Sequence, residues 1–349
     1  MKETLCDISA FRLYRTPPQL LAQFPMLPEP EIDKTRSKLR KHPITKHIIG
    51  PIAHLMVTER RQRSSAKHIQ SHLASTELPF GCVRASNLGV NITSPLFTLL
   101  QLAQHLPEEE LIMAMYEFCG SFTVFKPSPE AESMLANLQE TVPESWRRVR
   151  GKNGVATNLW QREPLITTEE LHAFAAATKG MRGNRRFAKA AKNVTGSAAS
   201  PFEAQISILL TRSRRKGGEG FPCFTNNKRI ALNPKAQMLS NRSTCYADIF
   251  FEGHGGKIPL IIECQGRIAH DDTDSAVSDG NRVVALQHMG YEVMLLSYEQ
   301  IAQSDRFEVV KRLIARYLGI KYRRKTKGLQ RLEHDLRRKL FIDWSAIAA

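Results

Sequence analysis

Two acidic residues and one amide lie where a buried strand is expected to end, in the last third of the chain. The apolar run at 260–262 is followed directly by Glu263, with Gln265 two residues later. Because alternate residues of a strand point to one face, Glu263 and Gln265 should project together. A glycine-rich turn at 253–256 predicts a hairpin that puts Asp248 on the neighbouring strand. Two carboxylates and an amide oxygen then meet at a strand end.

Oxygen ligands of this kind suit Mg²⁺ or Mn²⁺, and we expect Asp248 and Glu263 to bind the metal. Such an ion helps to position a phosphate, activates water and stabilises the charge that develops in phosphodiester cleavage. Glu203, which precedes the strands, is a candidate for a further acid. Downstream, His270, Asp279 and Arg282 are candidates for proton transfer or for holding phosphate. Spacing alone leaves a second interpretation open, in which Glu263 merely ends a strand at the surface.

The elements that must position these side chains follow one another from residue 200 onward. Ser200 and Pro201 are typical of a helix start, because serine caps the first turn and proline fits the first helical position. Apolar runs and turn residues then predict, in order, strands at 228–232, 245–252 and 257–265, a helix at 275–289, a strand at 291–297 and a helix at 305–318. This order predicts an α/β fold in which helices flank a mixed sheet.

The chain carries a net charge of +16 over 349 residues, and its basic residues are clustered. The clusters lie at 34–67, 179–216 and 316–339. Such blocks repel themselves unless a polyanion is near, and a phosphate backbone binds them through counterion release. We therefore expect DNA as a partner, with Arg214, Arg215, Lys216 and Arg282 as DNA-binding residues. The plainer interpretation is a solvated basic surface.

The front part of the chain predicts an α+β domain. A strand is expected at 52–57 and short strands at 77–93, and helices are expected to begin at Pro95 and Pro107. Composition shifts then predict the division of the chain into an α+β domain at 1–126, a linker and helical segment at 127–199, the domain with the acidic strands at 200–320, and a basic C-terminal helix at 321–349.

Other features exclude several classes of protein. No apolar run reaches the roughly 20 residues of a membrane-spanning helix. The first residues lack the pattern of a cleaved signal peptide. We therefore expect a soluble cytoplasmic protein. The six cysteines are scattered without a CxxC pair, which is typical of buried thiols in a reducing compartment. His68 and His72 would bind a metal if their segment were helical, but without an HExxH context a solvated face is favoured.

Five motifs occur in order from residue 200 onward: Ser200-Pro201-Phe202-Glu203, Tyr246-Ala247-Asp248, Glu263-Cys264-Gln265-Gly266 with His270, Asp279-Gly280-Asn281-Arg282, and Gly290-Tyr291-Glu292-Val293-Met294. Together they resemble the PD-(D/E)XK nuclease superfamily, and more closely its very-short-patch-repair-like endonuclease group. The resemblance implies a restriction-endonuclease-like sheet and a Mg²⁺-dependent DNA endonuclease. It also implies catalytic roles for Glu203, Asp248, Glu263, Gln265 and His270.

The resemblance spans residues 200–318, and the chain departs from the group at two positions. Tyr246 stands where the group usually has arginine. Gln265 stands where the group has aspartate and the wider superfamily usually has lysine, although some nucleases of the superfamily carry the same Glu-x-Gln pair. Glutamine has no formal charge and binds a metal more weakly than aspartate does. Two functions therefore remain open, an active endonuclease or a DNA-binding protein whose nuclease fold no longer cuts.

The front half carries a second, less specific pattern. It contains the strand at 52–57, basic residues at 60–63, the sequence Val-Asn-Ile-Thr-Ser-Pro at 90–95 and a glutamate-rich helix start at 107–110. Together these features resemble the C-terminal part of AbiEi-type abortive-infection antitoxins, which are transcriptional autorepressors. The resemblance implies an alternative function as a DNA-binding regulator or antitoxin in bacterial phage defence. A cognate toxin or another defence protein would then be a partner.

Overall fold

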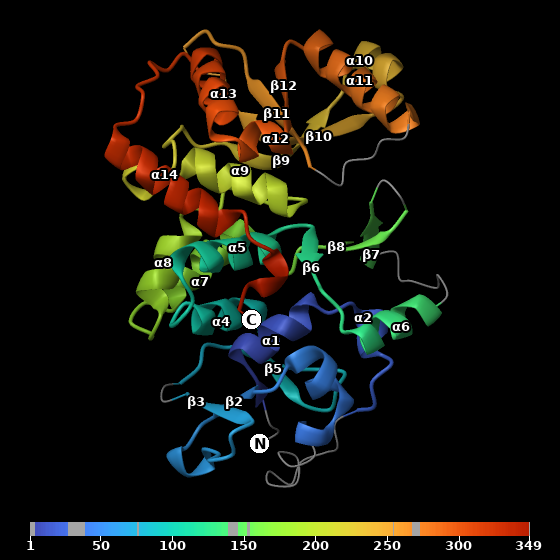
Figure 1. Cartoon of the computed structure of the whole chain (residues 1–349), viewed down its shortest axis with the longest axis vertical. Helices are drawn as coiled ribbons and strands as arrows, with labels where there is room; N and C mark the ends of the chain where they lie inside the picture. The colour runs from blue at the N-terminus through green and yellow to red at the C-terminus, as the bar shows by residue number, and fades with distance from the viewer. Residues whose placement is uncertain are drawn as a thin grey trace.

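The computed structural model describes residues 4–26, 39–74, 77–138, 146–151, 154–253, 255–266 and 273–348, and for 273–279 the backbone alone. Three sheets follow one another along the long axis of the molecule, with helices between and around them (Figure 1). The sheet that contains the first residues lies at one end, and the sheet formed after residue 224 lies at the other. The fold is thus mixed α/β, which confirms the fold class predicted from the sequence.

The front sheet has five strands in the order β3-β2-β1-β5-β4. Its strands are β1 (Thr4–Leu5), β2 (Ala53–Val57), β3 (Ile69–Leu73), β4 (Val83–Ala85) and β5 (Asn91–Thr93). β2 confirms the strand expected at 52–57, and β3 runs parallel to it at the edge of the sheet. Around the sheet lie α1 (Asp7–Arg15), α2 (Pro18–Leu21), the π-helical turn η1 (Thr45–Ile49) and η2 (Arg60–Gln62).

Helices fill the middle of the molecule. α4 (Pro95–Leu102) begins as predicted, with the Ser94 hydroxyl accepting a hydrogen bond from the Phe97 N–H and proline at the first helical position. α5 (Glu108–Cys119) is buried over its last nine residues and forms the centre of the molecule. α8 (Asn184–Ala191) packs against α4 and α5, and α7 (Thr168–Ala177) packs against α8. These helices lie between the front sheet and the rear sheet (Figure 1).

Residues 127–160 contain more structure than the linker predicted from their polar composition. They form α6 (Pro129–Asn137), β7 (Trp146–Arg150) and most of β8 (Ala156–Arg162), and β8 pairs with both β7 and β6 (Phe122–Val124). Trp160 is buried beneath the Arg148 guanidinium, which also forms an ion pair with Glu132 at 2.6 Å. The sheet is small and half exposed, so its strands lack the continuous apolar run by which a strand is recognised.

The rear sheet is mixed, as predicted, with strand order β12-β11-β10-β9. Its elements are α9 (Pro201–Thr211), β9 (Thr225–Ala231), α10 (Pro234–Ser240), β10 (Thr244–Phe251), β11 (Leu260–Gln265), α11 (Thr273–His288), β12 (Glu292–Ser297), α12 (Tyr298–Ala302) and α13 (Ser304–Tyr317). β11 and β12 are parallel, and the other neighbours are antiparallel. α9 packs on one face, and α10 and α11 cover the other. α10 was not predicted; it begins after Asn233, whose side chain accepts from the Ala236 N–H.

One main core runs from the front of the molecule to the rear. It includes Phe11 of α1, Phe118 of α5 and Leu209 of α9. α14 (Lys327–Leu340) lies within the segment 321–349 that was predicted as a basic helix. The chain then returns through η4 (Trp344–Ala346) to the front, where Arg15 donates to the Trp344 carbonyl at 2.6 Å. The boundaries predicted at 126, 199 and 320 all lie within the span of this core.

Two expectations about the chain as a whole can be compared with the structure. Within the described ranges, no helix combines the length and the apolar character needed to cross a membrane. The cysteines are free thiols, and four of them are buried, as the scattered spacing predicts. Cys223 differs because it is exposed.

Candidate functional site at the end of β10 and β11

Glu203 is fixed at the start of α9 by a reciprocal cap. The Ser200 hydroxyl accepts from the Glu203 N–H at 3.3 Å and donates to Glu203 Oε1 at 2.8 Å. Glu203 Oε2 accepts from the Ala199 N–H at 2.7 Å. Only 6% of Glu203 is exposed, and burial is the main reason that the pKa of its carboxyl is raised to about 8. The charges of Asp248 and Glu263 raise this pKa further, so the three carboxyls lie near one another.

Asp248 and Glu263 lie on adjacent strands, as the predicted hairpin requires. Ile249 of β10 pairs with Ile262 of β11, and the next step of this antiparallel register places Asp248 opposite Glu263. The Asp248 carboxylate accepts a hydrogen bond from the Cys264 N–H at 2.7 Å. Its side chain therefore reaches across to β11, beside Glu263.

Glu263 is nearly buried, with 2% of its surface exposed, and faces α11. Ile262 packs in the main core beneath α9, whereas Ile261 packs in the smaller core beneath α10 and α11. Glu263 is two residues beyond Ile261 and shares its face of the sheet. There its Oε2 accepts from Arg282 Nη2 of α11 at 2.8 Å. Glu203 approaches from α9, so the carboxyls gather around the strand ends from both faces of the sheet.

The chemistry of the donors fits a divalent cation of the magnesium type. Three carboxyls at a strand end supply the oxygen ligands that such ions prefer, and Mg²⁺ in proteins commonly uses only one or two carboxylates with several waters. Among the described residues, one group of three acidic, histidine or cysteine side chains has ligand atoms within 4.8 Å of one another, and it lies in the front sheet. The ligand atoms of Glu203, Asp248 and Glu263 are therefore not all within 4.8 Å of one another, so an ion here would be held by fewer than three carboxyls, with water as the remaining ligands.

The other predicted residues are distributed over several places. Gln265 ends β11 and is exposed. His270 lies outside the described residues. Arg214, Arg215 and Lys216 form η3 (Arg214–Lys216), which follows the C-terminal end of α9 and packs against α14. At about 1.5 Å per residue, η3 lies roughly 16 Å along α9 from Glu203, so these three basic residues do not line the carboxyl cluster.

Two basic residues near the carboxyls were missed by the sequence analysis. The strand register places Arg229 of β9 directly opposite Tyr246 of β10, and Lys228 opposite Ala247. Directly opposite residues share a face, and both Arg229 and Tyr246 are exposed. Arg229 therefore lies beside the position where the resembled nucleases have arginine. Only the strand pairing reveals this, because 17 residues separate the two in the sequence.

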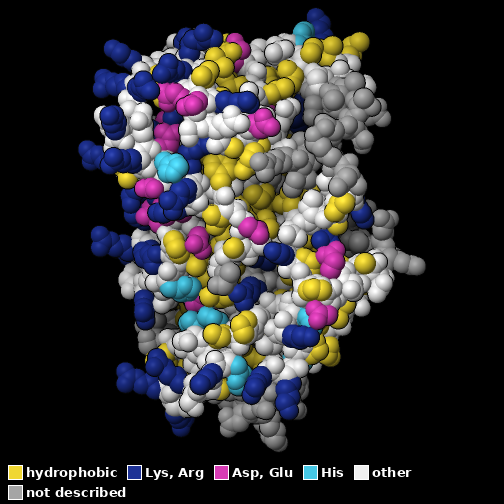
Figure 2. Space-filling model, viewed as in Figure 1, with side chains coloured by type: hydrophobic (Ala, Val, Ile, Leu, Met, Phe, Trp, Pro, Cys, Tyr) yellow, Lys and Arg dark blue, Asp and Glu magenta, His cyan; other side chains and the backbone are white. Residues whose placement is uncertain are grey.

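The remaining basic side chains form a broad surface. Figure 2 shows Lys and Arg side chains along the side of the molecule that carries α13, α14 and α8.

Comparison of the chain with models of known protein families, with curated proteins and with solved structures gave no match. The assignment of a function therefore depends on the residues and their geometry.

Proposed function

We infer that this protein binds DNA and that the end of its rear sheet is a metal-dependent centre for phosphodiester cleavage. The observation that carries the proposal is the approach of Glu203, Asp248 within β10 and Glu263 within β11, beside Arg282. The order α9, β9, α10, β10, β11, α11 and β12, with β12 parallel to β11, supports the resemblance to PD-(D/E)XK nucleases.

Asp248 and Glu263 would hold Mg²⁺ or Mn²⁺, which when bound supplies an activated water and stabilises developing negative charge. Arg282 holds the Glu263 carboxylate toward α11 through its ion pair. Glu203 keeps its proton near neutral pH because its pKa is raised to about 8. Glu203 would therefore contribute no charge to the site, which leaves Asp248 and Glu263 as the residues to hold the cation.

DNA binding is supported by the charge of the chain and by the edge of the rear sheet. The net charge of +16 favours binding to a polyanion, and such binding weakens with salt. Lys228 and Arg229 are exposed on β9, the edge strand next to β10. A DNA backbone that lies along this edge would contact these side chains and reach the strand ends.

Cleavage of supercoiled plasmid tests the proposal. Wild type with Mg²⁺ or Mn²⁺ should produce nicked circles, and Glu263→Gln should lower the rate by about 100-fold or more, since the amide is a weak metal ligand. Glu252→Gln is the matched control, because Glu252 is exposed just after β10. The proposal fails if wild type cuts with neither metal, or if Glu263→Gln cuts as fast as wild type.

A second function, DNA binding without cleavage, is favoured by two observations. Arg282 already pairs with Glu263, which takes up one of the carboxylates that would hold a metal. Gln265 at the end of β11 is uncharged and binds a metal more weakly than aspartate does. This function suits a transcriptional regulator or antitoxin with a toxin partner. It predicts salt-sensitive binding of duplex DNA that Glu263→Gln leaves unchanged, together with no nicking. Absence of binding at low salt would exclude it.

A further inference from the structure

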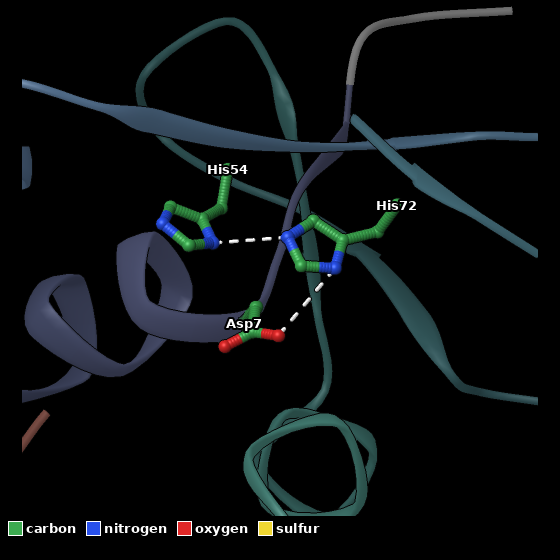
Figure 3. A group of neighbouring side chains, drawn as sticks. All are labelled: Asp7, His54 and His72. Atoms are coloured by element: carbon green, nitrogen blue, oxygen red, sulfur yellow. Dashed lines mark hydrogen bonds and ion pairs between the residues drawn. The ribbon is translucent and has the colours of Figure 1, made fainter. Parts of the chain in front are cut away.

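A cluster of histidines surrounds one buried carboxylate in the front sheet, far along the chain from the rear centre. Asp7, His54 and His72 point toward one another from three elements (Figure 3). His54 Nδ1 lies 2.9 Å from His72 Nε2, and His72 Nδ1 lies 3.5 Å from Asp7 Oδ2. His105 adds a hydrogen bond of 2.8 Å to the other carboxylate oxygen of Asp7.

The local fold holds each of these residues in place. β2 and β3 are parallel, with Met56 opposite His72, so His54 and His72 are diagonal neighbours on one face of the sheet. Asp7 follows β1 with a φ of 51°, a left-handed conformation that aspartate tolerates better than most residues. The Asp7 N–H donates to Gln101 Oε1, and the His54 N–H donates to the Ser9 hydroxyl. The cluster is thus anchored by α1, α4 and two strands.

The negative charge of the buried Asp7 carboxylate is the reason that this cluster favours a bound cation. The Asp7 side chain is 2% exposed, and the ion pairs found for it within the described residues are both with histidines, His72 and His105. A buried carboxylate is costly unless a cation balances it, and histidine supplies a charge only when protonated. His54 and His72 lie too close together for both rings to carry a proton on their facing nitrogens. A divalent cation would balance the carboxylate without protonating either ring.

We propose that Asp7, His54 and His72 form a site for a divalent transition-metal ion of the zinc class. Two imidazoles and a carboxylate suit such ions, whereas Mg²⁺ prefers oxygen ligands. Zinc bonds of about 2.0–2.1 Å in a tetrahedron put neighbouring ligand atoms about 3.3 Å apart. The ligand atoms here lie within 4.8 Å of one another, so these spacings would have to shorten by at most about 1.5 Å to hold the ion.

His105 acts as a positioning residue in this site. Its N–H to Asp7 Oδ1 orients the carboxylate, as hydrogen-bond partners of metal ligands commonly do. Side-chain exposure of 26% for His72 and 41% for His105 gives an ion a path from solvent. The bound ion would join the edge strand β3 to β2 and to the first residue of α1. It therefore stabilises the front sheet and is separate from the proposed cleavage centre.

Zinc titration of the metal-stripped protein by calorimetry tests the site. The Cys223→Ser background removes the exposed thiol, which would otherwise compete for zinc. One Zn²⁺ should bind per chain and raise the melting temperature, while Mg²⁺ should do neither. His54→Gln/His72→Gln should weaken Zn²⁺ binding by about 100-fold or more, and His105→Gln by about 10- to 100-fold.

His172→Gln is the matched control, because His172 is exposed on α7 away from the cluster, and it should bind Zn²⁺ as wild type does. Circular dichroism of each metal-free variant establishes that it is folded, and the single His72→Gln variant, at a partly exposed position, serves if the double variant unfolds. Absence of saturable Zn²⁺ binding by wild type would overturn the proposal, as would equal affinity in the folded His72 variants.

Discussion

The front histidine cluster and the rear carboxyl centre differ in how their residues are distributed along the chain. Asp248 and Glu263 come from one hairpin, and Glu203 starts the preceding helix. Asp7, His54 and His72 come from the first helix and two later strands, with no motif spacing among them. The rear centre offers oxygen ligands and the front cluster mainly nitrogen, so the two regions should select different metals.

The first prediction separates the two regions by their metals. Asp7→Asn replaces a charged ligand with a neutral amide and should lower Zn²⁺ affinity by about 100-fold, since only the two imidazoles remain as strong ligands. Calorimetry measures this change, and plasmid nicking by the same variant should equal that of wild type. A parallel loss of nicking would show that the two regions depend on one another.

The second prediction concerns stability at the rear centre. Arg282→Met keeps much of the side-chain bulk but removes the ion-pair partner of the nearly buried Glu263, and should lower the free energy of unfolding by about 2 kcal/mol. Denaturant unfolding measures it. Arg306→Met is the control, because Arg306 and Glu299 form an exposed pair at 3.3 Å that contributes less than about 1 kcal/mol. Equal losses in the two variants would contradict the structural role given to Arg282.

The third prediction concerns Gln265, which stands where the resembled nuclease group has aspartate. Gln265→Asp restores the carboxylate of the resembled group at an exposed strand end, and should raise the Mg²⁺-dependent nicking rate by about tenfold because the ion is bound more tightly. Steady-state plasmid cleavage at low Mg²⁺ measures the change. An unchanged or lower rate would mean that Gln265 does not face the metal.

The fourth prediction is a pH dependence of stability due to Glu203. Its pKa is about 8 in the folded protein and near 4.5 when unfolded, so unfolding releases a proton between these pH values and stability falls as pH rises across them. Glu203→Gln removes this proton release. In metal-free buffer, the melting temperature of the variant relative to wild type should therefore increase from pH 5 to pH 8. A difference that stays constant with pH would contradict the raised pKa.

The sequence predicted those helices and strands whose local signals agree with the fold. Proline and serine at Ser94-Pro95 and Ser200-Pro201 predicted the starts of α4 and α9, and the apolar runs predicted the rear strands. These signals act within a few residues, so the hairpin that carries Asp248 and Glu263 could also be predicted.

Contacts between distant segments could not be predicted in the same way. The sequence relates His72 only to His68, at helical spacing, but His72 lies on β3, where strand pairing brings it to His54. Arg229 next to Tyr246 likewise depends on register, which no short motif encodes. The small sheet of β6, β7 and β8 was overlooked because its half-exposed strands carry polar residues.

The difference between the two regions is tested most directly by one nicking assay with Mg²⁺ on three proteins. Wild type and His54→Gln/His72→Gln should nick supercoiled plasmid at similar rates, and Asp248→Asn should be slower by about 100-fold or more, because only the rear carboxyls hold the ion that cleavage needs. Undiminished nicking by Asp248→Asn, or its loss in the histidine variant, would contradict the account.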